Sequence, residues 1–471
     1  MLQSILARLV LASCNDSATF RDLGSLTSVI LLISAVLYRV LWKVNRFFFE
    51  KRFDFIKDGF RATSSSIYQT RLFQHVAIVL SGDEGRQVFF KEKGLCLYDT
   101  FSIMMGSGAA QFDPHQVGGV VKRMASVQRP DNLQKLIPLI LSECRRKMDA
   151  WGSERVLDPC SSLHEVAFHL VMCIASFDIA NDPVLSARLK SLVDTVDSIT
   201  NPYSTWVPWL PGPALFQKFF ASVQIYWIVQ AAIHTRKRSG IKRDDMLQQM
   251  INEGDGTIRI FGCMLGLSLA GARATGTIVT WLIMHLSSNP TWSSNVQEEI
   301  KTFISTHTSS SSPLSGNALI QALSEIPLTA WESQTPNLDL CIRETLRTSQ
   351  PYTAVRKNTG PDLTIGAYVI PLGIPRSLNP KYYSEPTRWD PSRVLEKETP
   401  FIGWGAGTHA CKGQRLATLS MKLMVAYALT QFDITMVDGQ GEKINRVPLP
   451  NWNDSATCRP KEECGIKFAE K

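Results

Sequence analysis

The sequence predicts one large, mainly α-helical domain with a small β region, preceded by a transmembrane helix near the N-terminus. Three observations support this prediction: helical periodicity dominates from about residue 134 to 430, strand-like alternation is brief, and a wholly apolar run lies close to the N-terminus. With 471 residues, 44% of them hydrophobic, the chain can bury a large core. Its length would also permit two or three domains, and no internal repeat is visible.

The apolar run covers residues 23–42 (LGSLTSVILLISAVLYRVLW) and carries no charge before Arg39. About 20 helical residues cross a bilayer core, so the run is long enough to act as an anchor. A buried amphipathic helix is the alternative, but this run is apolar on every face. Lys43 and Arg46 begin a basic flank, which by the positive-inside rule leaves the following chain in the cytosol. The expected organisation is a lumenal segment at 1–22, the anchor at 23–42 and one domain at 43–471.

The predicted elements follow from local patterns. Residues 75–80 alternate like a strand, residues 309–313 form a Ser-rich loop, and the Gly- and Pro-rich region 351–413 should contain coil and short strands. Helices are expected at 134–150, 161–176, 183–197, 214–238, 256–288, 293–306, 317–331, 337–348 and 412–431.

Charge and cysteine usage narrow the function. There are 50 Lys and Arg residues against 42 Asp and Glu, a formal net charge of +8, and the basic residues are scattered. This distribution argues against nucleic-acid binding and fits docking on anionic lipid or an acidic protein. The ten cysteines include no CxxC pair, so the spacing does not predict a zinc or thioredoxin-type site. Most should be reduced, buried thiols.

One cysteine differs from the others because it lies in a glycine-rich loop, GWGAGTHACKG at 403–413. Glycines 405, 407 and 413 leave backbone amides free to point at the sulfur of Cys411, and their dipoles should favour the thiolate. The missing side chains let a large, flat group approach. The loop thus suits a planar metallocofactor, although a structural cysteine beside a tight turn is the simpler alternative.

This stretch resembles the haem-binding signature of the cytochrome P450 superfamily. The resemblance implies haem b with Cys411 as its axial iron ligand, Gly405 and Gly413 shaping the loop, and His409 reaching a haem propionate. Trp404 stands where most members have Phe, a variant associated with fungal secondary-metabolism members, and should pack against the sulfur and porphyrin.

Two further motifs occur upstream of the loop. Glu344 and Arg347 match the family's ExxR, and their i, i+3 spacing places them on one helix face. The stretch PTRWDPSR at 386–393 resembles the family's PxxFxPxRF, whose arginine, here Arg393, closes a three-way structural network. Arg356 matches a propionate-binding basic residue. The family's WxxxR is absent, and Lys122 and Arg123 are weak substitutes for its propionate contact.

The helical segment 257–288 departs from the family where dioxygen and protons should be handled. Ala270 and Gly271 match the start of (A/G)GxxT, but Arg273 replaces the usual acid and Ala274 the usual Thr. Thr275 lies one position later, about 100° around the helix, so it would serve only if the helix unwinds locally at Gly271 or Gly276. Alternatively, these small residues simply permit close helix packing.

For two regions the sequence allows two interpretations each. The aromatic and proline residues at 203–213 suit either a membrane-facing lid or an ordinary packed loop. The chain after Gly373 is short compared with the family, which implies either a truncated strand or a lost exon.

The resemblance implies a membrane-anchored haem-thiolate monooxygenase of the endoplasmic reticulum, with its domain in the cytosol. It would receive electrons from NADPH-cytochrome P450 reductase and oxidise a small apolar natural product, in secondary metabolite biosynthesis. The altered residues 273–275 favour a second hypothesis, a haem-thiolate isomerase or dehydratase that needs no reductase. A non-catalytic haem protein is the third.

Overall fold

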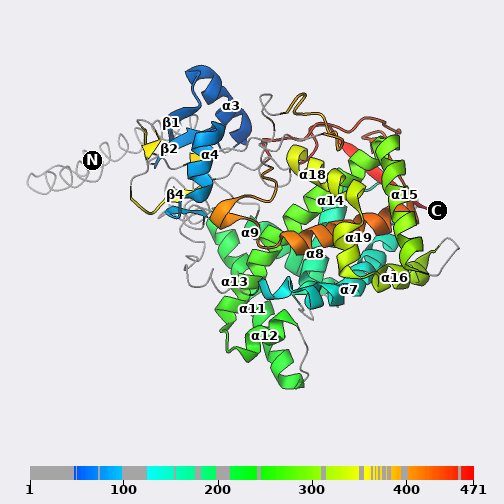
Figure 1. Ribbon diagram of the computed structural model, residues 1–471. Helices are drawn as coiled ribbons and strands as arrows, with labels where there is room; N and C mark the ends of the chain where they lie inside the picture. Colours follow the sequence, from blue (N-terminus) through cyan, green and yellow to red (C-terminus); the bar gives the residue numbers. More distant parts are fainter. Residues whose placement is uncertain are drawn as a thin grey trace, which may run out of the picture.

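The fold is a large helical body with small sheets at its edges, as the computed structural model shows (Figure 1). The structure describes residues 47–97, 123–175, 182–197, 213–240, 245–308, 314–349, 355–393, 401–454 and 458–471, with short gaps inside several of these ranges. The expected segments 1–22 and 23–42, the loop at 203–212 and the residues directly after Gly373 lie outside the described residues.

Many helices begin where the sequence supplies a proline or a capping side chain. Proline occupies the first turn of α7, α8 and α15, where its missing N–H costs nothing. Asp158 caps α8 by accepting from the backbone N–H of Cys160 at 2.9 Å. The helices are α3 (Arg52–Thr63), α4 (Gly82–Lys91), α7 (Pro130–Met148), α8 (Pro159–Ile174), α9 (Pro183–Asp197), α11 (Pro213–Ser239), α12 (Met246–Asn252), α13 (Thr257–Leu267), α14 (Arg273–Ser288), α15 (Pro290–His307), α16 (Gly316–Glu325), α17 (Leu328–Ser333), α18 (Pro336–Ser349) and α19 (Gln414–Gln431).

Four small sheets complete the described fold. The strand expected at 75–80 is β2 (His75–Leu80), which pairs with antiparallel β1 (Ile67–Leu72) and with parallel β7 (Leu372–Gly373). The third strand of this sheet is therefore present, and the described part of it covers two residues. The other strands pair antiparallel: β3 (Leu95–Cys96) with β4 (Lys357–Asn358), β5 (Thr364–Ile365) with β6 (Tyr368–Val369), and β8 (Phe432–Asp438) with β9 (Cys464–Glu470).

Several expected boundaries need correction. The helix expected at 317–331 is two helices, because Pro327 cannot continue α16 and instead precedes α17. The segment 256–288 is interrupted by a π-helical turn, η3 (Ser268–Ala272). The sequence analysis also missed α3, α4, α12 and the β8–β9 hairpin.

The two largest hydrophobic clusters of the described residues are each built from packed helices. One surrounds α14 and α19 with α7, α15 and α18, and the other packs α9, α11 and α13 around one end of α8. Among the described residues, Thr257–Ser288 is the one helical run long and apolar enough to cross a membrane, and 67% of its most apolar window is buried inside the protein. Its hydrophobicity is therefore accounted for by its central place in the core (Figure 1).

Candidate haem site

The cysteine loop is closed by backbone hydrogen bonds just before α19. The N–H of Cys411 donates to the carbonyl of Trp404 at 2.8 Å, and the N–H of Gly405 donates to that of Ile402 at 2.8 Å. Gly405 and Gly407 have φ angles of +70° and +64°, which side chains other than glycine rarely adopt. The loop therefore requires glycine at both positions.

Helix α4 lies directly against this loop. A Cβ on Gly407 would overlap the carbonyl oxygen of Phe90, at the C-terminal end of α4. On the other side, Trp404 packs against the main hydrophobic core together with Phe401 and Leu416. The loop that carries Cys411 is thus held between α4 and the core.

The thiol of Cys411 is exposed, yet the protein around it still restricts its hydration. Desolvation raises the pKa of Cys411, while a hydrogen bond from the backbone N–H of Gly413 and the charge of Lys412 act in the opposite direction. The Gly413 amide favours the thiolate, as expected from the sequence, but desolvation outweighs it in the protein alone, so the net pKa of Cys411 is raised. A bound cation would reverse that balance, since a coordinating thiol is deprotonated.

Two basic residues lie close together near the loop. His409 contacts the carbonyl of Leu95 through Nε2 at 3.0 Å, which ties the loop to β3. Arg356 is buried, donates to the carbonyl of Val355 at 2.8 Å and lies over the ring of Phe89. Burial and the nearby charge of Arg356 both lower the pKa of His409. A carboxylate between the two side chains would relieve that repulsion.

Arg123 has other partners. Its guanidinium forms ion pairs with Glu253 and with Asp255, the second at 2.6 Å, in the segment that joins α12 to α13. These two carboxylates already balance its charge, which disfavours the propionate contact expected from the sequence. The pairing instead attaches the chain before α7 to the start of α13.

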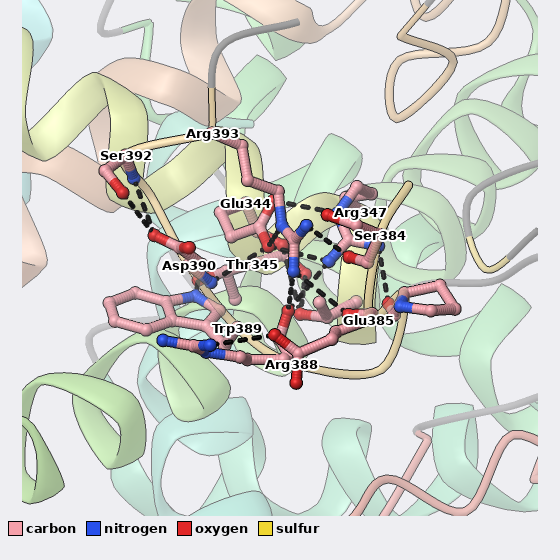
Figure 2. Close-up of polar contacts among 12 residues, drawn as sticks. Glu344, Thr345, Arg347, Ser384, Glu385, Arg388, Trp389, Asp390, Ser392 and Arg393 are labelled. Atoms are coloured by element: carbon pink, nitrogen blue, oxygen red, sulfur yellow. Dashed lines mark hydrogen bonds and ion pairs between the residues drawn. The ribbon is translucent and has the colours of Figure 1, made fainter. Parts of the chain in front are cut away.

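The three residues Glu344, Arg347 and Arg393 are in contact (Figure 2). Arg347 donates to both carboxylate oxygens of Glu344, at 2.8 and 2.6 Å, and Arg393 donates to Oε1 at 3.1 Å. Glu344 and Arg347 are 5% and 2% exposed, so this is a buried ion network rather than a surface pair.

The same network organises the loop at 383–393. Arg347 donates to the carbonyls of Pro386 and Arg388, at 2.6 and 3.0 Å, and the N–H of Asp390 donates to Glu344 at 3.0 Å. Arg393 donates to the carbonyls of Ser384, Glu385 and Arg388 (Figure 2). The charged side chains thus satisfy backbone groups of an irregular segment, which explains why it holds one shape.

The helix expected to manage dioxygen contains a local irregularity that includes Gly271, one of the two positions considered in the sequence analysis. The π-helical turn Ser268–Ala272 includes Ala270 and Gly271, and such turns recur at functional sites. Ala270 is exposed and Ala274 is partly exposed, whereas Thr275 is 7% exposed. Gly276, next to Thr275, packs against His164 of α8, where a Cβ would lie 2.9 Å from the His164 Cα. The small residues therefore serve close packing on one face and leave space on another.

Arg273 forms an ion pair with Asp197, the last residue of α9. The side chains are 18% and 17% exposed. A carboxylate at a helix C-terminus is unfavourable by itself, so Arg273 compensates a charge that the helix dipole would oppose. The residue that replaces the family's acid thus links α14 to α9.

The residues present fit a haem group. An exposed thiol with an amide donor supplies a soft ligand for iron, and the adjacent pair of basic residues suits two carboxylates. On the helix α13, a Cβ added to Gly262 or Gly266 would meet no other atom within 4 Å. These features match the needs of a large, planar, dianionic cofactor with a metal centre.

Comparison with known proteins agrees with this geometry. The family model described as cytochrome P450 matches residues 145–450. The cytochrome P450 monooxygenase AacuE of Aspergillus aculeatus is 26% identical over 68% of this chain and 68% of its own length. The lanosterol 14-alpha demethylase of Bos taurus is 25% identical over 78% of this chain and 75% of its own. A solved structure, a retinoic acid-bound cyanobacterial CYP120A1, superposes with a TM-score of 0.67 at 17% identity, covering 86% of this chain and 92% of that one.

The chain belongs to the cytochrome P450 family. It is an oxidoreductase with monooxygenase activity, and its cofactor is haem held through a cysteine thiolate, as in the family. Redox partners of the reductase class serve this family in general.

The sequence analysis missed four contact groups at the site. Asp197, Glu253, Asp255 and the carbonyl of Phe90 all lie far along the chain from the residues they contact. One local signal could have indicated a partner: Asp197 ends the predicted helix 183–197, where a carboxylate is unfavourable unless a positive charge lies nearby.

Proposed function

We propose that the protein is a membrane-anchored monooxygenase of the endoplasmic reticulum that holds haem through Cys411 and oxidises a small apolar natural product. The observation that carries the proposal is the closed glycine loop that presents an exposed thiol beside His409 and Arg356. NADPH-cytochrome P450 reductase is the proposed electron donor, and the domain at 43–471 is the proposed catalytic unit. The monooxygenases of Aspergillus aculeatus and Cryptosporiopsis sp. that resemble this chain, together with Trp404, support a role in fungal secondary metabolism.

In this proposal each residue acts through its position. Cys411 would supply the sulfur ligand, and the N–H of Gly413 would moderate the charge on that sulfur. His409 and Arg356 would bind the propionates, while Glu344, Arg347 and Arg393 hold the loop at 383–393 in place. Ala270 and Gly271 leave room for dioxygen and substrate. Haem bound through a thiolate supplies dioxygen activation, so that RH, dioxygen and two electrons with two protons give ROH and water.

A second candidate is a haem-thiolate isomerase or dehydratase. It is favoured by one observation: Arg273 is engaged with Asp197, and Ala274 carries no hydroxyl, so neither usual proton-transfer group is present. Product formation without electrons or reductase would support this candidate, whereas NADPH-dependent product formation supports the monooxygenase.

The first prediction tests the ligand. Reduced, carbon monoxide-treated protein should show the strongly red-shifted Soret band of thiolate ligation, and Cys411→Ala should abolish that band. Cys96→Ala, which removes another cysteine that is not fully buried, is the matched control and should retain the band. Retention of the band in Cys411→Ala would refute the assignment.

A further inference from the structure

A second set of metal-binding side chains lies between α7 and α8. It consists of Glu143 from α7 and of His169 and Cys173 from α8, hereafter the α7–α8 cluster. Each offers one ligand atom, and the three atoms lie within 4.8 Å of one another. None of them belongs to the residues assigned to haem.

The helices bring these three side chains together by simple geometry. His169 and Cys173 are four residues apart on α8, so they lie on the same face, one turn apart. Glu143 approaches from α7, and its Oε2 lies 2.7 Å from His169 Nε2, while Cys173 Sγ lies 3.3 Å from the same nitrogen. A carboxylate, an imidazole and a thiol therefore converge on one point from two helices.

Nε2 of His169 has more hydrogen-bonding neighbours than a single ring nitrogen can satisfy. Nε2 of His169 also contacts the guanidinium of Arg146, a donor that requires the lone pair of the ring nitrogen. Glu143, an acceptor, requires an N–H on the same atom. No single tautomer of His169, which is 2% exposed, satisfies both neighbours. A cation at this point would instead be shared by nitrogen, oxygen and sulfur.

The charges around the cluster allow a cation to replace the present contacts. Arg146 neutralises Glu143 through a contact of 2.8 Å, but its side chain is 46% exposed and can turn into solvent. Lys147, the next residue, forms an ion pair with Glu165 at 2.8 Å, so its positive charge is already partly balanced outside the cluster. A divalent cation would be balanced by the carboxylate of Glu143 and the thiolate of Cys173. The thiol proton would pass to the buffer.

The ligand set selects the cation. One nitrogen, one oxygen and one sulfur with a free fourth position suit tetrahedral Zn²⁺ better than Mg²⁺ or Ca²⁺, which prefer oxygen alone. Bond lengths of about 2.0–2.3 Å place tetrahedral zinc ligands roughly 3.3–3.6 Å apart. The nitrogen–oxygen separation of 2.7 Å must therefore widen by about 0.6 Å, and the nitrogen–sulfur separation of 3.3 Å already fits. The oxygen–sulfur separation, which is at most 4.8 Å, must also come into this range.

We propose that Glu143, His169 and Cys173 bind one divalent cation of the zinc class, which joins α7 to α8 independently of haem. The sequence alone did not indicate it, because the third ligand comes from another helix and the spacing His-x3-Cys is not a familiar zinc pattern. Since the cation binds the folded protein and crosslinks two core helices, it stabilises that fold by mass action.

The test uses the full-length, haem-loaded protein without a histidine tag, treated with chelator and then equilibrated with zinc chloride against a competing chelator. The expected result is one equivalent of zinc per chain and a higher thermal unfolding midpoint. Cys173→Ser and Glu143→Gln should each weaken zinc binding at least tenfold. Cadmium in place of zinc should produce thiolate-to-metal absorption in the ultraviolet that Cys173→Ser lacks.

Cys160→Ser provides the matched control. Cys160 and His164 lie on the same helix with the same four-residue separation, but they do not belong to the cluster. This variant should bind zinc like the wild type. The proposal is refuted if the wild type retains no zinc, or if Cys173→Ser and Glu143→Gln bind it as tightly as Cys160→Ser. Because the mutated Glu143 is partly exposed on α7, the Gln variant still reports if the serine variant fails to fold.

Discussion

At the residue scale, Gly407 is the most constrained position of the cysteine loop. It combines a φ of +64° with a backbone approach of Phe90 that leaves no room for a side chain. We therefore predict that Gly407→Ala lowers the free energy of unfolding by more than about 3 kcal/mol and reduces haem content, because strain and overlap add. Chemical unfolding and the haem-to-protein absorbance ratio measure both effects.

Gly441→Ala separates the cost of backbone strain from the cost of steric overlap. Gly441 has a φ of +85°, but an added Cβ would meet no atom within 4 Å. Its substitution should cost only the backbone strain, about 1–2 kcal/mol, and leave haem content unchanged. Equal costs at both positions would show that α4 does not press on the loop.

Thr275 is the second informative residue. It carries the one hydroxyl in the segment 270–275, next to the π-helical turn, although its side chain is buried. If it takes part in proton delivery, Thr275→Ala should lower the product formed per NADPH several-fold and raise hydrogen peroxide release, with haem binding intact. Thr277→Ala, at an equally buried threonine two positions away, should leave this ratio unchanged. Unchanged coupling in both variants would point to a water or a substrate hydroxyl instead.

At the scale of elements, the Glu344 network joins α18 to the irregular segment 383–393. We predict that Arg347→Ala costs about 3–5 kcal/mol and yields little haem-loaded protein, because a buried carboxylate loses its closest partner. Expression yield, haem content and unfolding by denaturant test this effect. A stable, haem-loaded but slow variant would mean that Arg347 acts in the reaction itself.

Arg388 provides the comparison within the same segment. Its i, i+3 pair with Glu385 has the same spacing and chemistry, but both side chains are exposed. Arg388→Ala should leave stability and haem content nearly unchanged, since solvent screens such pairs. The contrast isolates burial, rather than charge, as the reason for the importance of Arg347.

At the scale of the whole molecule, the proposed membrane attachment rests on the sequence alone. Residues 23–42 are proposed as the anchor, with the basic flank on the cytosolic side. Protease added to sealed microsomes should therefore digest the domain at 43–471, while a lumenal marker protein stays intact. Protection of the domain without detergent, and its digestion only after detergent, would reverse the proposed topology.

The helical body was predictable because its signals are local. Periodicity locates α7, α8, α9 and α15 within about four residues of their observed bounds. The short helix α12 and the hairpin β8–β9 were missed, since they depend on packing rather than on a long repeated pattern. The ExxR spacing and the glycine loop indicated the contact pairs and the loop shape near Cys411 for the same local reason.

The sequence by itself determined the family resemblance, the cysteine with its glycines, and the face that Glu344 and Arg347 share. Only the tertiary structure decided that Arg123 is engaged by Glu253 and Asp255, that Arg273 pairs with Asp197, and that Gly407 abuts α4. It also brought Glu143 to His169 and Cys173. The physical reason is that backbone conformation and helix faces depend on neighbours within about one turn, whereas the partner of a charge or a ligand depends on which helices pack together.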